Sequence, residues 1–292
     1  PRLVLGDGAL EQIAEELPRL GTRALIVTDP GIVAAGILDT VRDVLAASGL
    51  PLETFTDVIG NPDIATVDAA DKVRAAAKAD ILIAIGGGSA MDVAKSVAVL
   101  ATNGGSITDY EGVDRFDNRP LPVIAVPTTV GSGSEVTKGA VILNPTTHVK
   151  IVIVSDLMFA TIAVLDRRVV AGLPGRIAAT TGMDALTHAI EAYVSKGANP
   201  VTDAINIGAI ELIGANLVAA SKGDPDALYS MLVASSMAGI GFHDAGLGAV
   251  HALANTIGAQ FGVHHGTANA LFLPYVMDFN LSAAPARFAR IA

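Results

Sequence analysis

The stretch Asp80–Thr102, DILIAIGGGSAMDVAKSVAVLAT, decides the fold of the first half of the chain. An apolar run, DILIAI, leads directly into the turn GGGS, and a helical pattern follows it. Glycines between a strand and a helix let the backbone approach an anion, and the unpaired N–H groups of the first helical turn favour negative charge. The turn Gly86–Ser89 is therefore a candidate phosphate site. The alternative is a tight strand-to-helix turn without a ligand. The spacing is not G-x-G-x-x-G, so the turn does not match the plain dinucleotide-binding fingerprint.

The first half of the sequence alternates strand-like and helix-like segments. Short β-branched runs occupy Arg23–Asp29, Leu52–Ile59, Asp80–Ile85 and Pro122–Thr129, and helical patterns occupy Ala9–Leu20, Ile64–Ala79 and Ala90–Thr102. This alternation predicts a Rossmann-like α/β domain around a mostly parallel sheet, whose strands are apolar because both faces are covered. We expect the three short runs within Val141–Asp166 to form a hairpin or a sheet edge.

The second half has a different pattern. From Leu173 onward, Ala-rich segments at helical spacing replace the β-branched runs. They occupy Arg176–Ser195, Val201–Ser221, Asp226–Ile240 and Leu247–Ala259. We predict an all-helical second domain over residues 173–292 and an α/β domain over residues 1–172, with the boundary at Gly172–Pro174.

Composition and charge exclude several classes of function. The 292 residues are 51% hydrophobic and 16% charged, with a net charge of −10, and the pI is near 4.9. Scattered bases among more numerous acids disfavour nucleic acid and an anionic membrane surface as partners. The longest stretch without a charged residue, 245–277, contains three histidines and several glycines, so we do not expect a membrane span. We recognise no targeting signal and expect a cytoplasmic protein.

Cysteine is absent from the sequence, which removes disulfides, thiolate zinc sites and thiol nucleophiles. Any metal must therefore be held by His, Asp or Glu. Asp184 and His188 are four residues apart in TGMDALTHAIEAYVS, which places both on one helix face and is typical of metal ligands. The alternative is an Asp–His pair on a helix surface. Glu191 continues that face, and we expect it to be a solvated or helix-capping acid.

Three of the other five histidines cluster between residues 251 and 265. His251 lies in an apolar helical segment, where an imidazole needs a polar partner, and His264 and His265 precede Gly266. One carboxylate and three imidazoles without sulfur suit Fe(II) or Zn(II). We expect His148 and His243, by contrast, to be surface or locally hydrogen-bonded residues.

Two further features point to a nucleotide. Asp29 ends a predicted strand, where an acid accepts hydrogen bonds from ribose hydroxyls and repels a 2′-phosphate, so it favours NAD over NADP. Its alternative role is to cap the helix that follows Pro30. The loop PTTVGSGSEVT, residues 127–137, offers hydroxyls and amides to a phosphate or a ribose, although such loops are also common as turns.

Together these motifs make the sequence similar to the iron-containing, or group III, alcohol dehydrogenases. The resemblance covers nearly the whole chain and rests on GGGSAMDVAK (86–95), PTTVGSGSEVT (127–137), TGMDALTHAIEAYVS (181–195) and GLGAVHALANTIGAQFGVHHGTANALFLP (246–274). It implies a dinucleotide-binding domain, a helical domain, and a metal held between them by one Asp and three His. Carried over by motif, these ligands are Asp184, His188, His251 and His265. His265 is preferred over His264 because it directly precedes the motif's Gly-x-Ala-Asn-Ala.

The resemblance also implies a set of cofactor contacts. They are Asp29, Asn61, Gly87, Gly88, Ser89, Asp92, Thr128, Thr129, Ser132, Thr137 and Lys150. Two features depart from the family pattern. Asn255 stands where many relatives carry a His that faces the nicotinamide, and an amide does not exchange a proton near neutral pH. The chain stops at Ala292, whereas family members continue with more helices, so we expect it to be truncated at its C-terminus.

These observations predict a metal-dependent dehydrogenase that moves a hydride between NAD(H) and a small primary alcohol or its aldehyde. One alternative is an NAD-dependent metal lyase of the dehydroquinate synthase type, although that family uses a Glu ligand. Another is an inactive partial copy that only binds NAD. The resemblance further implies a homo-oligomer, and the run Leu3–Leu5 is a candidate edge for pairing with another subunit.

Overall fold

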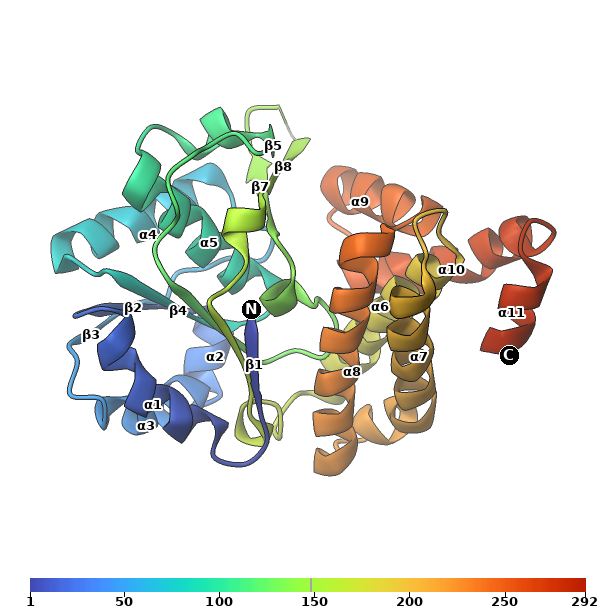
Figure 1. Cartoon of the computed structure of the whole chain (residues 1–292), viewed down its shortest axis with the longest axis horizontal. Coiled ribbons are helices and arrows are strands. Elements are labelled where there is room, and N and C mark those ends of the chain that lie inside the picture. The colour runs from blue at the N-terminus through green and yellow to red at the C-terminus, as the bar shows by residue number, and fades with distance from the viewer. Residues whose placement is uncertain (148) are drawn as a thin grey trace. The chain divides into compact units, whose positions relative to one another are not determined.

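The computed structural model describes residues 1–147 and 149–292, with only the backbone of Ala259, so the prediction for His148 lies outside the described residues. The described residues form two compact units, shown in Figure 1. One contains residues 1–128 and 134–169, and the other contains residues 129–133 and 170–292. The sequence predicts a domain boundary between residues 172 and 173. In the structure the second unit begins three residues earlier, at Val170, and it also includes the loop Thr129–Gly133.

A six-stranded parallel sheet organises the first unit. Its strands, in the order β1-β9-β6-β4-β2-β3, are β1 (Arg2–Leu5), β9 (Ile162–Leu165), β6 (Val123–Pro127), β4 (Ile81–Gly86), β2 (Ala24–Val27) and β3 (Leu52–Phe55). Every residue of β2, β4, β6 and β9 is buried, which explains why their sequences are apolar without alternation. The predicted parallel α/β architecture is confirmed.

Five helices follow the strands of this unit. They are α1 (Ala9–Leu20), α2 (Pro30–Ala34), α3 (Ile37–Ala46), α4 (Ile64–Ala77) and α5 (Gly88–Asn103). Three predicted helices correspond to α1, α4 and α5. Helix α5 starts directly after β4 and buries most of its length, because small alanines and valines let it pack closely on the sheet. This packing holds the glycine turn at the carboxyl end of the central strand.

The β-rich stretch after residue 139 divides between two sheets. Strands β7 (Gly139–Asn144) and β8 (Val149–Val154) form the predicted hairpin, and β5 (Gly112–Val113) joins β8 in a three-stranded sheet. The third run, predicted as part of a hairpin or sheet edge, is instead β9, an interior strand between β1 and β6. Its four buried apolar residues belong to a strand covered on both faces. The run Leu3–Leu5 lies in β1 and pairs with β9 of the same chain.

The second unit is a helical bundle. Its helices are α6 (Gly175–Val194), α7 (Pro200–Ala220), α8 (Pro225–Ala245), α9 (Ala249–Phe261), α10 (His265–Leu281) and α11 (Pro285–Ile291). The four predicted helical segments correspond to α6, α7, α8 and α9. Helix α7 is long and apolar enough to cross a membrane by length and composition alone. It packs against α6 and α8.

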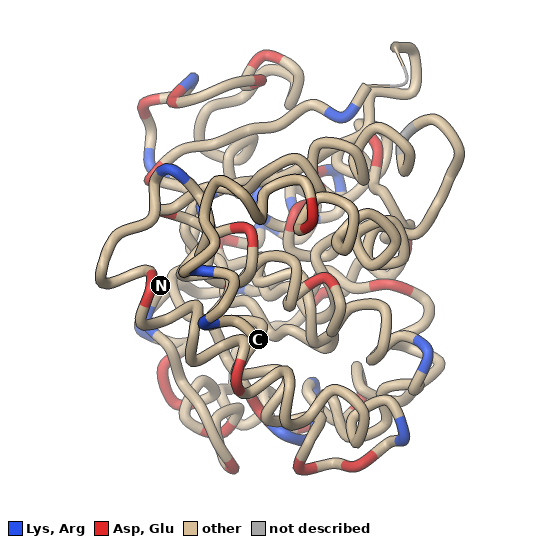
Figure 2. The backbone as a smooth tube through the Cα atoms, turned by 90° about the vertical axis from the view of Figure 1, so that its right-hand side faces the viewer, with Lys and Arg blue, Asp and Glu red and all other residues tan. Residues whose placement is uncertain are grey.

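Charged residues are distributed widely over the backbone. Figure 2 shows acidic and basic positions interspersed along the tube, with acidic ones more numerous.

Asp166 links the end of β9 to the start of α1. This buried carboxylate accepts hydrogen bonds from the Leu10 backbone N–H (3.3 Å) and from the Arg168 guanidinium (2.7 and 2.9 Å). Burial alone would raise the pKa of Asp166, but the bonds from Arg168 and the backbone bring that pKa below its usual value. The carboxylate therefore stabilises the fold in its ionised form.

We expect Asp166→Asn to lower the free energy of unfolding by about 2 kcal/mol, because the Arg168 and Leu10 donors lose a charged acceptor. The folded pKa is depressed, so this stabilisation is present above a pH of about 4 and is lost as the pH falls through the folded pKa. Urea unfolding at several pH values measures it. Asp156→Asn, at a largely exposed ion pair with Lys138, is the control and should change stability little. Equal effects of the two variants would contradict this role of Asp166.

Candidate functional site

Helix α6 carries two of the predicted ligands on one face. Asp184 and His188 are 6% and 4% exposed, and the Asp184 Oδ1 atom lies 3.8 Å from His188 Nε2. The i, i+4 spacing of a helix produces this proximity. The pair is buried, so it is not the surface Asp–His pair that was the alternative interpretation.

Two more imidazoles reach the same carboxylate oxygen from other helices. The Nε2 atoms of His251, on α9, and His265, at the start of α10, each lie 3.6 Å from Asp184 Oδ1. The His188 and His251 rings stack with their centroids 4.5 Å apart. His264, which precedes α10, is exposed. Three helices thus bring all four predicted ligand residues around one oxygen atom.

The outer ring nitrogens of two histidines have hydrogen-bond partners. His188 Nδ1 is 3.2 Å from the Gly131 carbonyl oxygen, and His251 Nδ1 is 2.6 Å from Glu191 Oε2. Because a carbonyl or carboxylate oxygen only accepts, each Nδ1 carries a proton. In the neutral ring, which is the form that binds a metal, each Nε2 then presents a lone pair toward Asp184. Gly131 approaches α6 closely enough that a Cβ atom there would lie 2.3 Å from the Thr181 carbonyl oxygen.

Glu191 has one of the two roles expected of it, that of a helix-capping acid. It is not solvated but 5% exposed, one turn beyond His188. Its carboxylate accepts hydrogen bonds from the backbone N–H groups of Gly248 (3.0 Å) and Val250 (2.7 Å), in the first turn of α9. It therefore caps a neighbouring helix and orients the His251 ring at the same time. The i, i+3 spacing from His188 was the available sequence signal.

The charges of the cluster depend on one another. Burial alone would raise the pKa of Asp184, but the imidazoles of His188, His251 and His265 hold that pKa well below its ordinary value. Burial lowers the pKa of His188 to about 3. Burial also disfavours the charged form of His251, yet the Asp184 and Glu191 carboxylates raise its pKa to about 9. Without a cation, His251 therefore carries a second proton at neutral pH. An ionised carboxylate and a neutral imidazole are the forms that bind a metal, so a cation would displace that proton.

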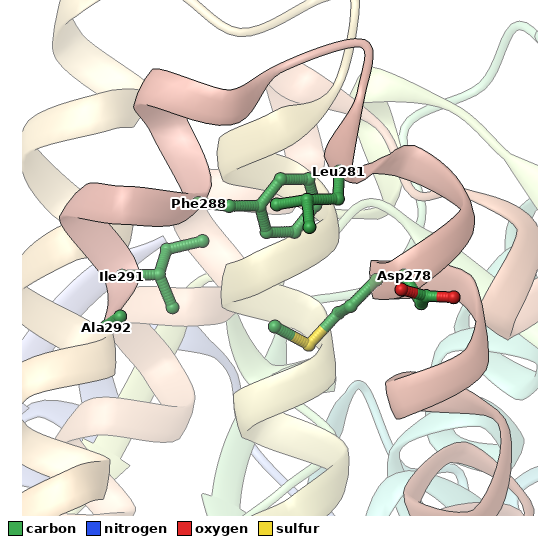
Figure 3. A pocket seen from close by; sticks show the side chains of 6 residues that line it. Asp278, Leu281, Phe288, Ile291 and Ala292 are labelled. Carbon is green, nitrogen blue, oxygen red and sulfur yellow. The ribbon is translucent and has the colours of Figure 1, made fainter.

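The cluster fits a divalent cation. Ligand atoms in a tetrahedral site with bonds of about 2.1 Å are about 3.4 Å apart, and the imidazole nitrogens here lie 3.6 to 3.8 Å from Asp184 Oδ1. Ligand atoms of Asp184, His188 and His251 also lie within 4.8 Å of one another. A separate apolar hollow between α10 and α11, shown in Figure 3, is lined by Met277, Asp278, Leu281, Phe288, Ile291 and Ala292 and includes none of these four residues.

The glycine turn lies where the sequence predicted it. Gly87 is the N-cap of α5 without a side-chain cap, and Gly88 and Ser89 form the first helical turn. Thr128, at the end of β6, donates its backbone N–H to the Gly86 carbonyl oxygen (3.0 Å). Its buried hydroxyl has no hydrogen-bond partner among the described residues. The turn therefore combines uncapped helix N–H groups with an unpaired hydroxyl, as an anion site requires.

Asp29 lies at the carboxyl end of β2, beside this turn. Its Oδ1 accepts hydrogen bonds from Gly31 N (2.8 Å) and Ile32 N (3.1 Å) and so caps α2. Its Oδ2 lies 3.5 Å from the position that a Cβ atom on Gly86 would occupy. One oxygen thus has the capping role that was the alternative interpretation, while the other faces the glycine turn.

A second group of predicted contacts gathers around Asp92 on α5. Its carboxylate accepts hydrogen bonds from the Ser134 hydroxyl and from Val141 N, both at 3.2 Å. Removal from water raises the pKa of Asp92 to about 6, against the effect of the Lys95 ammonium. Partial burial lowers the pKa of Lys150, and Asp92 opposes this shift. Asp92 and Lys150 therefore interact electrostatically.

Lys95 was not among the predicted residues, yet it orders this region. Its side chain is 1% exposed, and its Nζ donates to the carbonyl oxygens of Ser134 (2.7 Å), Thr137 (2.9 Å) and Gly139 (3.0 Å). Burial lowers the pKa of Lys95 to about 8. A buried ammonium with three carbonyl partners fixes the backbone around Thr137.

The remaining predicted residues are more dispersed. Asn61 has a left-handed backbone conformation, with φ of 55°, in a turn whose Pro62 carbonyl accepts from Leu143 N of β7 (2.8 Å). Thr129 and Ser132 belong to the loop that is grouped with the helical unit. His243 lies 3.8 Å from the Asp244 carboxylate, which is the local contact expected of it.

Two family models match this chain, and together they cover most of its length. A family model described as iron-containing alcohol dehydrogenase matches residues 1–167. A second model, described as the C-terminal part of the Fe-containing alcohol dehydrogenase family, matches residues 178–292.

Individual relatives are similar over most of their own length. The chain is 43% identical over 290 residues to alcohol dehydrogenase 4 of Saccharomyces cerevisiae (strain YJM789), covering 98% of this chain and 76% of that one. It is 39% identical over 295 residues to the NAD-dependent methanol dehydrogenase of Bacillus methanolicus, covering 100% and 77%. The crystal structure of a 1,3-propanediol oxidoreductase superimposes with a TM-score of 0.97 at 40% identity, covering 99% and 77%.

We expect Glu191→Gln to lower the free energy of unfolding by about 2 kcal/mol, because the first-turn N–H groups of α9 lose a charged acceptor. Amide hydrogen exchange at Gly248, Val250 and His251 should accelerate more than exchange elsewhere in the unit. Glu211→Gln, at an exposed position on α7, is the matched control. Unchanged protection of the α9 amides in Glu191→Gln would contradict the capping role.

Proposed function

The chain belongs to the iron-containing alcohol dehydrogenase family and is an oxidoreductase, and from this we propose that it exchanges a hydride between NAD(H) and a small primary alcohol. In the oxidative direction the alcohol loses a hydride to NAD⁺ and a proton to water, and the aldehyde is released. We further propose that a divalent metal is held by Asp184, His188, His251 and His265. Fe(II) is the preferred ion, and Zn(II) suits the same donors.

The single observation that carries the proposal is the convergence of three imidazole nitrogens on Asp184 Oδ1, at 3.6 to 3.8 Å. In this cluster, neutral imidazole nitrogens facing a carboxylate are unfavourable unless a cation or a donor lies among them. A cation bound there supplies Lewis-acid polarisation of the substrate oxygen.

The protein's own residues prepare this site. Asp184 stays ionised at neutral pH because the surrounding imidazoles lower its pKa. Gly131 and Glu191 hold the protons of His188 and His251 on the outer nitrogens, which leaves the inner ones as donors of electron pairs. The Asn255 amide does not ionise near neutral pH, so a proton relay through that position is not part of the proposal.

Several features support NAD as the hydride carrier. The uncapped start of α5 and the unpaired Thr128 hydroxyl suit a diphosphate. Asp29 offers one carboxylate oxygen beside the turn, which favours a ribose with a free 2′-hydroxyl. One relative is named as an NAD-dependent methanol dehydrogenase, which supports both the cofactor and a small primary alcohol.

The decisive experiment combines elemental analysis with an assay. Protein purified without chelator is analysed for iron and zinc, titrated with NAD, and assayed for NADH with a series of small primary alcohols. Stoichiometric metal with NADH formation supports the proposal. NAD binding without metal or turnover would support the alternative of a partial copy that only binds NAD.

We expect His265→Ala to lose most of the bound metal and of the NADH formation while NAD binding is retained, because the metal loses one of four ligands. His264→Ala is a close control, since it removes the neighbouring exposed imidazole. Metal content, NAD affinity and turnover are measured for both variants. Stoichiometric metal in His265→Ala, or metal loss in His264→Ala, would contradict the ligand assignment.

Asp29→Ser should shift the cofactor preference toward NADP by about tenfold or more, because a carboxylate that repels the 2′-phosphate is removed. Serine is chosen because it also caps helices, so α2 should keep its N-terminal hydrogen bond. The ratio of kcat/KM for NAD and NADP measures the effect. Asp63→Ser, at the N-cap of α4, makes the same change at another helix start. An unchanged ratio in Asp29→Ser would exclude Asp29 as the residue that contacts the ribose.

A further inference from the structure

Asn269 lies inside the cluster of predicted ligands, although neither the motifs nor the comparisons assign it a role. It is fully buried on α10, one turn after His265. Its Nδ2 lies 2.5 Å from Asp184 Oδ1 and 3.2 Å from the Nε2 atoms of both His251 and His265. Its Oδ1 is buried and has no hydrogen-bond partner among the described residues.

The chemistry of these atoms explains why the amide nitrogen points inward. An amide NH₂ group donates two hydrogen bonds and accepts none. Asp184 Oδ1 is an acceptor, and His251 Nε2 is one as well when that ring is neutral, because its proton is then on Nδ1 beside Glu191. The partial positive charge of the NH₂ group therefore offsets the repulsion between acceptors in a buried site. The amide oxygen, by contrast, has no hydrogen-bond partner among the described residues, which is unfavourable for a buried polar atom.

A metal ion and the Asn269 amide need the same lone pairs. An imidazole Nε2 has one lone pair, so an atom bound to a cation has none left for an N–H donor. The contacts of Asn269 with His251 and His265 are consequently available only when the cation is absent. Loading the site therefore releases the amide from these two contacts.

We propose that Asn269 is a positioning residue that holds the ligands of the empty metal site together and competes with the incoming cation. This inference rests on the proposed function, in that it assumes the cluster binds a divalent metal. An interaction made only in the empty state lowers metal affinity by the amount that it stabilises that state. Asn269 thus keeps the site assembled before loading and sets how tightly the metal is held afterwards.

The test compares the wild-type chain with Asn269→Ala, both stripped of metal and then titrated with Zn(II) in a calorimeter. The proposal expects the variant to bind Zn(II) about tenfold or more tightly, because the competing donor is gone. The thermal midpoint of the metal-free variant should fall by more than that of the loaded variant. A residue that only fills space would lower both midpoints alike and leave the affinity unchanged.

A second variant and a control complete the design. Asn269→Ser leaves a smaller cavity and should change the affinity in the same direction if Asn269→Ala folds poorly. Asn280→Ala, about three turns along the same helix, should leave Zn(II) affinity as in the wild type. Weaker or unchanged Zn(II) binding by the Asn269 variants would overturn this inference alone. Absence of Zn(II) binding by the wild-type chain would overturn the proposed metal site as well.

Discussion

The second unit is organised by one electrostatic constraint: a buried carboxylate, Asp184, faces three imidazole nitrogens within 3.8 Å. Acceptors at this separation repel one another in an apolar interior, so the arrangement persists only where positive charge or N–H donors compensate. Three neighbouring polar groups are arranged accordingly. Glu191 and the Gly131 carbonyl hold protons on the outside of two rings, and the Asn269 amide lies on the inside.

Close backbone approach makes this convergence possible. A Cβ atom on Gly266 would lie 2.1 Å from the Thr180 carbonyl oxygen, so only glycine allows α10 to start against α6 and to deliver His265 to Asp184. Gly131 has the same function for the loop that contacts His188. The loop therefore belongs to the helical unit by its packing, although in sequence it lies between a strand and a hairpin of the α/β unit.

In the α/β unit, a buried sheet and buried charges position the candidate nucleotide-binding residues. Its candidate nucleotide residues lie on loops and helix starts, which the buried parallel sheet holds at the carboxyl ends of its strands. Lys95 orders this region because its ammonium is buried and donates hydrogen bonds to three carbonyl oxygens of one segment. Asp92 pairs with the same segment through Ser134 and Val141. Burial of these two charges thus orders a backbone that has little regular structure of its own.

The sequence by itself determined the local features of this protein. Periodicity placed the strands β2, β3, β4 and β6 and the helices α1, α4, α5 and α6 to α9. The four-residue spacing of Asp184 and His188 indicated a shared helix face. These patterns depend on backbone geometry within a few residues. The tertiary structure alone decided the burial of Glu191, the inward position of Asn269, the interior place of β9 and the grouping of Thr129–Gly133 with the helices. These features arise from contacts between segments far apart in the chain, such as the 85 positions that separate Asp184 from Asn269. Such contacts depend on how whole helices and strands pack, and local sequence patterns do not encode that packing.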